Sequence, residues 1–185
     1  MMRPVTLIDA ADDAAVAGWL AGRIGAALER RDGGVALAFP GGATPFPIIA
    51  QLLTHPLAWP RVAIYPTDDR LVGEDHPASN AGRLRALLEP AGASVRPLAL
   101  DGPGTTVPRC ALVWLGMGAD GHIASLFPNT DPALDDPLRV RRLTPDPLPP
   151  EAPFDRITLT LPALLASDEV LLVARGAAKR AVLDA

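Results

Sequence analysis

The stretch LVWLGMGADGHIASLFP, residues 112–128, decides how the rest of this sequence is interpreted. It opens with an apolar, β-forming run at 112–115, breaks at Gly116-Met117-Gly118, and becomes apolar again from Ile123. This pattern predicts a buried strand that delivers Asp120 and His122 at its carboxyl end. Ligands of open α/β sheets bind at that end of the strands, and glycine lets the backbone approach a ligand closely. The sequence therefore predicts a site that follows this strand.

Composition limits what such a site can bind. The chain has 185 residues, 49% hydrophobic and 21% charged, which is enough for one domain with its own core. Its formal net charge of −4 gives no global field that favours nucleic acid or an anionic membrane, so any phosphate must be held by local groups. No apolar run is long enough to cross a bilayer, and the start MMRPVTLIDAADD lacks the order of a signal peptide. We expect a soluble, cytoplasmic protein.

Metal-binding and redox chemistry find little support in the sequence. Cys110 is the single cysteine, which excludes an internal disulfide and a cysteine-based metal cluster. Its position beside the predicted strand indicates a small core residue. The three histidines are scattered and offer no clustered ligand set. We therefore expect neither a metal nor another cofactor.

Helical and extended patterns alternate along the chain. Apolar residues at spacings of three and four predict a helix over 9–31, with Asp9 or Asp12 as its cap and Gly33-Gly34 at its end. Three further helices are predicted. One begins after residue 44, the next ends near residue 88, and the last begins at residue 175. Strands are predicted at 35–39, 62–65, 95–100, 156–161 and 169–174, the last of them buried.

This alternation predicts an α/β fold, a mostly parallel sheet with helices on both faces. The proline-dense passage at 129–153 is too broken for a long helix, and we predict a loop that crosses near the site. No internal repeat, low-complexity tract or composition shift marks a second domain.

A glycine-rich turn, PGGATP at 40–45, joins the strand at 35–39 to a predicted helix. Thr44 is expected at the helix N-cap and Pro45 at its first position. In that arrangement free backbone N–H groups and the helix dipole face an anion. Spacing alone does not separate such an anion site from an ordinary turn.

Charged residues follow the strand at 62–65. Thr67-Asp68-Asp69-Arg70 comes directly after it, and DHPASN at 75–80 leads into the next helix. Adjacent carboxylates can solvate a loop, cap a helix or orient the neighbouring arginine. The Arg70 guanidinium offers a bidentate fork to a phosphate or a developing oxyanion. His76 lies in a polar loop with no local partner for proton transfer, so we interpret it as structural.

Together these motifs resemble a known family. GMGADGHIASLFP is similar to the signature of the 6-phosphogluconolactonases, within the larger family that includes the glucosamine-6-phosphate deaminases. GGATP resembles the phosphate loop GGSTP, with Ala43 in place of serine, and DDR followed by DHPASN resembles DER followed by DHPxSN. RITLTLP resembles the family's RxTLTLPAL. The motif VxGxxK maps a phosphate-binding lysine onto Lys179.

The resemblance implies a Rossmann-like fold and hydrolysis of 6-phospho-D-glucono-1,5-lactone to 6-phosphogluconate in the oxidative pentose phosphate pathway. His122 is then the general base, oriented by Asp120 or by Asp68. The oxyanion is held by backbone N–H groups of 116–121 or by Arg70. The expected phosphate ligands are Gly41, Gly42, Ala43, Thr44, Arg70 and Lys179.

Two other functions stay open. Glucosamine-6-phosphate isomerases/deaminases resemble GHIAFNEP, in which a glutamate assists ring opening where this chain has Phe127. Their DEY-like triplet corresponds to Asp68-Asp69-Arg70, and both differences favour the lactonase. A catalytically weak sugar-phosphate-binding homologue is the third interpretation, suggested by Ala43 and by a shortened chain.

The resemblance also implies missing elements. Residues 1–185 read as a single sugar-phosphate lactonase domain, shortened before residue 110, where an additional helix is absent, and at the C-terminus, where a closing strand and helix are absent. An uncovered parallel sheet exposes apolar surface and a strand edge, here expected near Glu169–Ala174. We expect a homodimer, or a partner subunit, to bury it. The other expected partner is a small phosphorylated sugar lactone, and we expect no nucleic acid or membrane partner.

Overall fold

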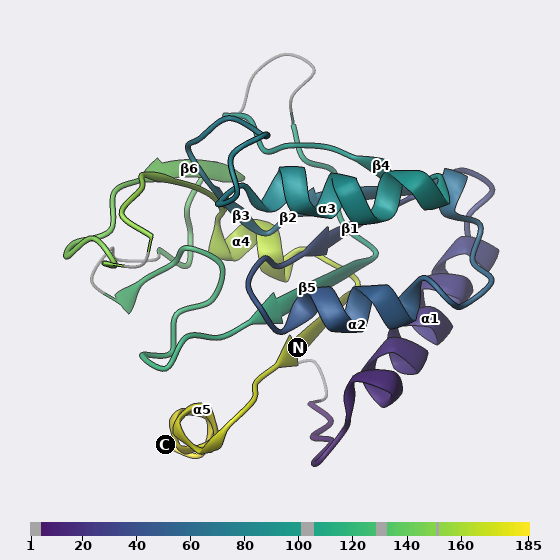
Figure 1. The fold of residues 1–185 in the computed structure, drawn as a ribbon, viewed down its shortest axis with the longest axis horizontal. Helices are drawn as coiled ribbons and strands as arrows, with labels where there is room; N and C mark the ends of the chain where they lie inside the picture. The colour runs from purple at the N-terminus through teal and green to yellow at the C-terminus, as the bar shows by residue number, and fades with distance from the viewer. Residues whose placement is uncertain (1–4, 101–105, 129–132, 151) are drawn as a thin grey trace.

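A five-stranded parallel sheet forms the centre of the computed structural model, which describes residues 5–100, 106–128, 133–150 and 152–185 (Figure 1). The strand order is β4-β2-β1-β5-β8. Their bounds are β4 (Ser94–Val95), β2 (Val62–Pro66), β1 (Val35–Phe39), β5 (Leu112–Gly116) and β8 (Glu169–Val173). The predicted α/β fold with a mostly parallel sheet is confirmed, although the strand expected at 95–100 is limited to the short β4.

Helices cover one face of this sheet. They are α1 (Asp13–Glu29), α2 (Pro45–Leu52) and α3 (Asn80–Leu88), and their apolar side chains form one core with the alternate residues Val35, Leu37 and Phe39 of β1. A short 3₁₀ turn, η1 (Trp59–Arg61), follows the loop after α2, and another, η2 (Glu89–Ala91), follows α3 directly. A parallel sheet requires this cover because both of its faces are apolar.

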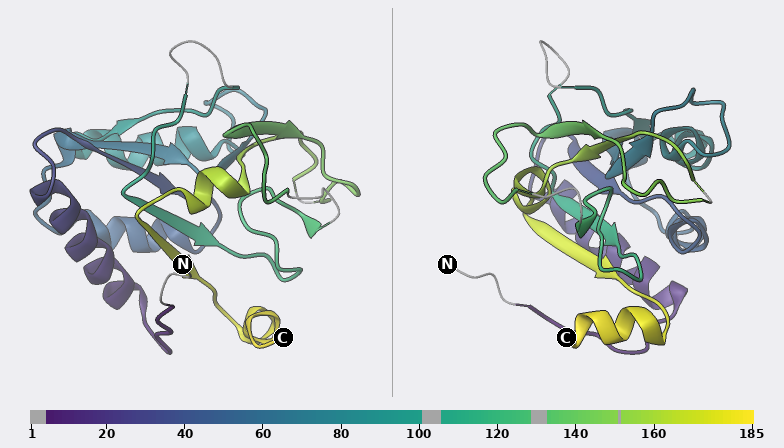
Figure 2. Two further views of the ribbon diagram at one scale, coloured as in Figure 1. Left: turned by 180° about the vertical axis from the view of Figure 1, so that it is seen from behind. Right: turned by 90° about the vertical axis from the view of Figure 1, so that its left-hand side faces the viewer.

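The other face carries α4 (Leu161–Leu165) and a three-stranded antiparallel sheet (Figure 2). That sheet has the order β3 (Asp68–Arg70), β7 (Arg156–Leu159) and β6 (Val140–Leu143). A second core fills the space between the two sheets. The last helix, α5 (Ala177–Leu183), lies at the end of the molecule beside the N-terminal segment (Figure 2).

The prediction of a loop over 129–153 is wrong in its centre. β6 lies within that segment and pairs with β7 from Val140 opposite Leu159 to Leu143 opposite Arg156. Two arginines between Val140 and Leu143 hide its alternation, and the strand forms because β7 supplies an antiparallel partner. Residues 129–132 and 151 of the segment lie outside the described residues.

β8 differs from the buried strand that was predicted. It lies at the edge of the sheet, and its side chains alternate between partly buried and exposed. Val170 and Leu172 are 38% and 37% exposed. The apolar surface expected near 169–174 is therefore present, because only one face of β8 packs against the core.

Two polar residues define the ends of α1. The Asp12 carboxylate accepts a hydrogen bond from the Ala15 N–H at 2.7 Å, so Asp12 and not Asp9 caps the helix. The helix ends at Glu29, before the glycines expected to stop it. There Arg61 Nη2 donates to the carbonyls of Leu28 and Gly33 at 3.1 and 2.8 Å, which satisfies groups that a helix end leaves free.

Cys110 is buried as predicted, 3% exposed, just before β5. Burial raises the pKa of its thiol to about 11. The thiolate, which is the reactive form, is therefore almost absent at neutral pH, and Cys110 acts as a small core residue.

Candidate functional site

A cleft of about 250 Å³ opens at the carboxyl ends of β1, β2, β5 and β8. Parallel strands bring their following loops to one edge of a sheet, so residues far apart in sequence meet there. The cleft is lined by Pro40–Pro45, Thr67, Asp68, Arg70, Asn80, Trp114, Gly116–Gly118, His122, Ala124, Val173 and Lys179. The structure thus brings together every predicted site residue except Asp120, which contacts His122 from outside the lining.

The predicted base is paired with one carboxylate. His122 Nδ1 lies 2.6 Å from Asp120 Oδ1, and the His122 backbone N–H also donates to that oxygen at 3.3 Å. An ionised carboxylate can only accept, so in the neutral imidazole the Nδ1 atom carries the proton and the Nε2 atom has the lone pair. Burial opposes ionisation of Asp120, but the hydrogen bonds from His122 outweigh it and lower the pKa of Asp120.

Glycine at position 118 is a steric requirement of this pair. A Cβ atom there would lie 2.2 Å from His122 Nδ1 and 2.5 Å from Asp120 Oδ1. The Gly118 N–H donates to the His122 carbonyl at 2.8 Å, and Gly121 adopts a φ of 89°, which glycine tolerates without strain. The glycines in GMGADGH therefore let the imidazole and the carboxylate pack directly on the backbone of their own loop.

Asp68 is held by a different partner. The Ser125 hydroxyl donates to Asp68 Oδ2 at 2.5 Å, and Thr67 Oγ1 lies 3.3 Å from Asp68 Oδ1. Burial raises the pKa of Asp68, against the Ser125 hydrogen bond and the charge of Arg70, which lower it. Of the two carboxylates that the sequence left open, the one bonded to the His122 imidazole is Asp120.

Asp69 and Arg70 have different positions: Asp69 makes structural contacts, and Arg70 lines the cleft. The Asp69 carboxylate accepts from the backbone N–H groups of Asn80 at 2.6 Å and Ala81 at 2.9 Å, and so caps the start of α3. Arg70 Nη1 donates to the Ala78 carbonyl at 2.9 Å, while its buried Nε has no hydrogen-bond partner among the described residues. The Arg70 guanidinium thus lines the cleft, and its Nε–H is a donor that no described residue uses.

The loop after β1 leaves its polar groups open to the cleft. Thr44 is at the N-cap of α2 and Pro45 follows it, but the Thr44 hydroxyl makes no capping hydrogen bond. Gly42 has a φ of 96°, and a Cβ on Gly41 would lie 1.9 Å from Asn80 Oδ1. The loop before α2 therefore presents backbone N–H groups and the Thr44 hydroxyl, the donors that an anion requires, while in the first turn of α2 Pro45 and Pro47 have no N–H to add.

Lys179 reaches the cleft from α5. No residue of α5 is buried, and the segment is fastened to the N-terminal region by Arg175, which pairs with Asp13 at 3.0 Å, and by Arg180, which pairs with Asp9. None of the ion pairs within the described residues involves Lys179. Its ammonium group is the cleft's second cation beside Arg70.

Sequence reasoning missed two polar residues of the site. Asn80 is buried, donates from Nδ2 to the Asp68 carbonyl at 2.8 Å, and keeps Oδ1 without a partner among the described residues. Ser125 binds Asp68. Both lie inside the quoted motifs DHPASN and GHIASLFP, but a single sequence does not show which motif letters face a cleft. His76 is exposed, and its Nδ1 accepts from the Ala78 N–H at 3.1 Å, in line with a structural role.

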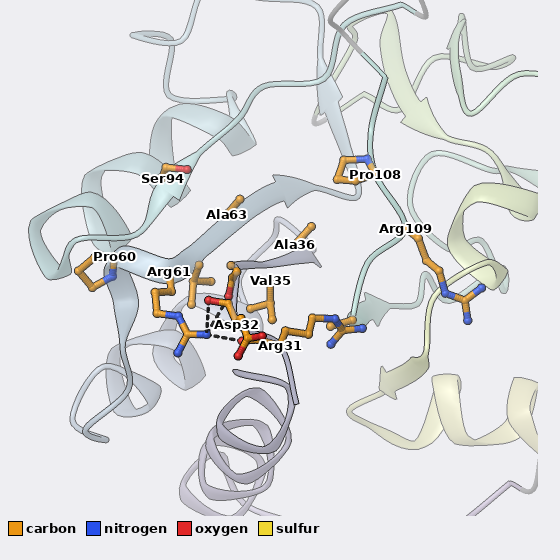
Figure 3. A pocket seen from close by; sticks show the side chains of 14 residues that line it. Arg31, Asp32, Val35, Ala36, Pro60, Arg61, Ala63, Ser94, Pro108 and Arg109 are labelled. Atoms are coloured by element: carbon orange, nitrogen blue, oxygen red, sulfur yellow. Dashed lines mark hydrogen bonds between the residues drawn. The ribbon is translucent and has the colours of Figure 1, made fainter. Parts of the chain in front are cut away.

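A larger hollow, about 650 Å³, lies at the opposite, amino end of the sheet (Figure 3). Its arginines are engaged within the protein: Arg61 holds the carbonyls at the end of α1, and Arg31 and Arg109 both pair with Asp168. Figure 3 shows Arg61 at one side of the hollow and Arg109 at the other, with Asp32 and Arg31 between them. Small side chains, among them Ala36 and Ala63, line its sheet face. This hollow brings no acid, base or nucleophile into a convergent arrangement.

Neither a metal site nor a membrane span is found in the parts of the chain that the structure describes. No group of His, Cys, Asp and Glu side chains in those parts is arranged to hold a metal ion. Likewise, none of the described helices has the length and apolar character needed to span a bilayer.

Comparison with known proteins gives a consistent result. The sequence profile described as glucosamine-6-phosphate isomerases/6-phosphogluconolactonase matches residues 9–98 and 92–185. The chain is 36% identical to a 6-phosphogluconolactonase of Caulobacter vibrioides, over 92% of this chain and 81% of the relative. It is also 36% identical to one of Pseudomonas aeruginosa, over 90% and 76%. A solved 6-phosphogluconolactonase structure from Shewanella baltica superimposes with a TM-score of 0.80 at 28% identity, covering 93% of this chain and 80% of that one.

Proposed function

The chain belongs to the glucosamine-6-phosphate isomerase/6-phosphogluconolactonase family, and from this membership we propose that it hydrolyses 6-phospho-D-glucono-1,5-lactone to 6-phosphogluconate. The enzyme is a carboxylic ester hydrolase of the oxidative pentose phosphate pathway. One observation carries the proposal: the Asp120–His122 pair opens into the same cleft as the loop before α2 and Lys179.

The phosphate binds where the cleft offers donors. The loop Gly41-Gly42-Ala43-Thr44 presents N–H groups at the start of α2, and Lys179 supplies a positive charge. Ala43 contributes its backbone only, so the Thr44 hydroxyl is the side-chain donor of this loop. Because the chain carries a net charge of −4, these short-range contacts act without long-range attraction of the substrate.

His122 performs the proton transfers. Its Nε2 atom takes a proton from a water molecule, whose oxygen attacks the lactone carbonyl carbon. The tetrahedral intermediate then expels the ring oxygen, and Nε2 returns the proton to that oxygen as the C–O bond breaks. Asp120 keeps the imidazole in the required tautomer and stabilises its positive charge while it holds the proton.

The developing oxyanion needs preorganised donors. The Arg70 guanidinium, with its unpartnered Nε, and the backbone N–H groups of the 116–121 loop are available for it. Asp68 lies in the same cleft and accepts a hydrogen bond from a sugar hydroxyl, which orients the ring against His122. None of these steps requires a cofactor.

A lactonase assay tests the proposal. Purified protein is supplied with 6-phosphogluconolactone, and release of 6-phosphogluconate is followed against the spontaneous hydrolysis of the same preparation. We expect a rate that scales with protein concentration. A rate equal to the uncatalysed background would reject the lactonase and leave the sugar-phosphate-binding homologue.

The deaminase alternative is disfavoured by the position of Phe127. In the deaminase motif a glutamate occupies this position, whereas here the Phe127 ring packs on the His122 imidazole with centroids 4.5 Å apart. An apolar side chain thus packs on His122 at the position where ring opening would need a carboxylate. We expect no turnover of glucosamine 6-phosphate in the same preparation that hydrolyses the lactone.

The proposal also includes a cellular location and an oligomeric state. A cytoplasmic location suits a phosphorylated substrate, since its charge opposes passage through a bilayer. The exposed apolar residues of β8, Val170 and Leu172, with Leu165 at the end of α4, support a homodimer through this edge. Sedimentation over a wide concentration range checks it: a monomer that persists and binds no apolar dye would contradict the dimer.

A further inference from the structure

Ser125 occupies an unusual position for a hydroxyl side chain. It is 1% exposed, its Oγ donates to Asp68 Oδ2 at 2.5 Å, and its backbone N–H donates to Thr158 Oγ1 at 3.2 Å. Thr158 is itself fully buried and hydrogen-bonded to the Leu159 carbonyl at 3.0 Å. A buried polar group costs free energy unless it is satisfied, and here each donor of Ser125 has a partner.

These bonds join three separate segments. Ser125 belongs to the loop that carries His122, Asp68 follows the end of β2, and Thr158 is the residue of β7 that pairs with Asp68 across the antiparallel sheet. The loop turns at Ala124, which adopts a φ of 49°, so that Ser125 points inward. Two polar side chains of the cleft, Asp68 and His122, are thereby linked to each other through Ser125.

We propose that Ser125 is a positioning residue for the reaction proposed above, in which its hydroxyl fixes the Asp68 carboxylate in the cleft and ties the His122 loop to the end of β2. This inference rests on the proposed function for its catalytic consequence. The hydrogen bond from Ser125 to Asp68 is present in the unliganded protein, so its effect on Asp68 can be measured without turnover.

The charges around Asp68 explain why this hydroxyl matters. The charges of Arg70 and Asp69 in β3 and of Arg156 in β7 act on Asp68, and His122 and Lys179 line the same cleft. Burial favours the protonated form of Asp68, and the Ser125 hydrogen bond opposes this by stabilising the carboxylate. Without the hydroxyl, the pKa of Asp68 rises further and the carboxyl group loses its fixed orientation.

Two substitutions separate this role from packing. Ser125→Ala removes the hydroxyl, whereas Ser125→Cys keeps nearly the same volume but offers only a weak donor. If Ser125 acts through its hydrogen bond, both variants lower kcat/KM for the lactone by about tenfold, the usual worth of one bond to a charged group. If it only fills space, Ser125→Cys retains wild-type kcat/KM.

The decisive measurement is a carbon-13 NMR titration of the aspartate carboxyl groups in the unliganded protein. Comparison with Asp68→Asn identifies the Asp68 signal. We expect the pKa of Asp68 to be higher in Ser125→Ala and in Ser125→Cys than in wild type, with native dispersion of the other signals showing that both variants fold. An unchanged Asp68 pKa in both variants overturns the proposal.

Failure of the proposed function is distinguishable in the same experiment. If wild-type protein does not hydrolyse the lactone, the lactonase assignment fails, while the titration still decides whether Ser125 controls Asp68. If wild type is active and the Asp68 pKa rises in both variants, yet kcat/KM is unchanged, Ser125 holds Asp68 without serving the reaction, which also overturns the proposal.

Discussion

The two hollows at opposite ends of the parallel sheet differ in what their charged groups are doing. The amino-end hollow, about 650 Å³, is lined by Arg31, Arg61 and Arg109, whose guanidinium groups bind carbonyls of the protein or Asp168. The carboxyl-end cleft, about 250 Å³, is smaller and contains fewer cations. There, however, none of the ion pairs within the described residues involves Arg70 or Lys179, whereas Arg31 and Arg109 are both paired with Asp168. Each end keeps one guanidinium nitrogen without a hydrogen-bond partner among those residues, Arg31 Nη1 and Arg70 Nε.

This difference teaches that volume and the number of arginines are poor guides to a binding site. A guanidinium already engaged by carboxylates and carbonyls has little left for a ligand, because displacing those partners costs what the ligand would gain. Topology provides the second distinction. Loops after parallel strands converge on one cleft, whereas the amino ends of the strands are reached by turns that serve the helix ends.

The largest expected effect concerns His122, the proposed base in the carboxyl-end cleft. His122→Ala removes the proton acceptor and should lower kcat by roughly a hundredfold to ten-thousandfold, the usual contribution of a positioned acid/base. Its folding should change little, since the side chain is partly exposed. Steady-state kinetics corrected for spontaneous hydrolysis checks this prediction, and unchanged turnover would remove His122 from the mechanism.

The second prediction contrasts one cation from each end of the sheet. Lys179→Ala should raise KM for the phosphorylated lactone by about tenfold to a hundredfold, the worth of one charge-assisted contact, with a much smaller effect on unphosphorylated gluconolactone. Arg31→Ala, the matched control at the amino end, should leave both KM values unchanged. If Lys179→Ala weakens both substrates equally, Lys179 acts structurally.

The third prediction uses the buried carboxylate of the cleft. Asp68 has a raised pKa because of burial, so its ionisation costs stability once the pH rises through the folded-state pKa. Asp68→Asn should therefore be more stable than wild type at neutral pH, and the difference should vanish as the pH falls below the ordinary value of 3.8. Its kcat/KM should fall by about tenfold, the loss of one charged contact. Thermal unfolding across pH, with kinetics, measures both.

The smallest expected effect lies at the amino end. Arg31 and Arg109 together lower the pKa of Asp168 against the effect of its burial, and all three side chains are a third or more exposed. Arg109→Ala should reduce the free energy of unfolding by less than about 1 kcal/mol, as is typical of exposed ion pairs, and leave activity intact. A loss of lactonase activity in that variant would mean that the larger hollow is functional.

The fold was predictable where the apolar pattern of a segment matches the face that the segment packs against the core. Apolar periodicity located α1, β1, β2, β5 and α3, because these elements pack against one core on the face that their pattern shows. β6 was missed, since its formation depends on pairing with a strand distant in sequence. The exposure of β8 was missed in the strand prediction because an apolar run does not show how many of its faces are covered.

The sequence predicted most of the residues that line the carboxyl-end cleft, but not the contacts between them. Residues of the motifs GADGH and GGATP meet at one cleft. Which of Asp120 and Asp68 is the partner of His122, however, depends on a distance that the sequence spacing does not give. Asp69, adjacent to both Asp68 and Arg70, turned out to cap α3. Neighbouring side chains in a strand point to opposite faces, so sequence adjacency does not give a shared role.

The central claim is that the carboxyl-end cleft, and not the larger hollow, binds the phosphorylated sugar. A crystal structure of the protein with 6-phosphogluconate tests it most directly. We predict the phosphate at the Gly41–Thr44 loop beside Lys179, with the carboxylate formed in the reaction near His122 and Arg70. The sugar phosphate bound instead among Arg31, Arg61 and Arg109, with the carboxyl-end cleft empty, would contradict the account.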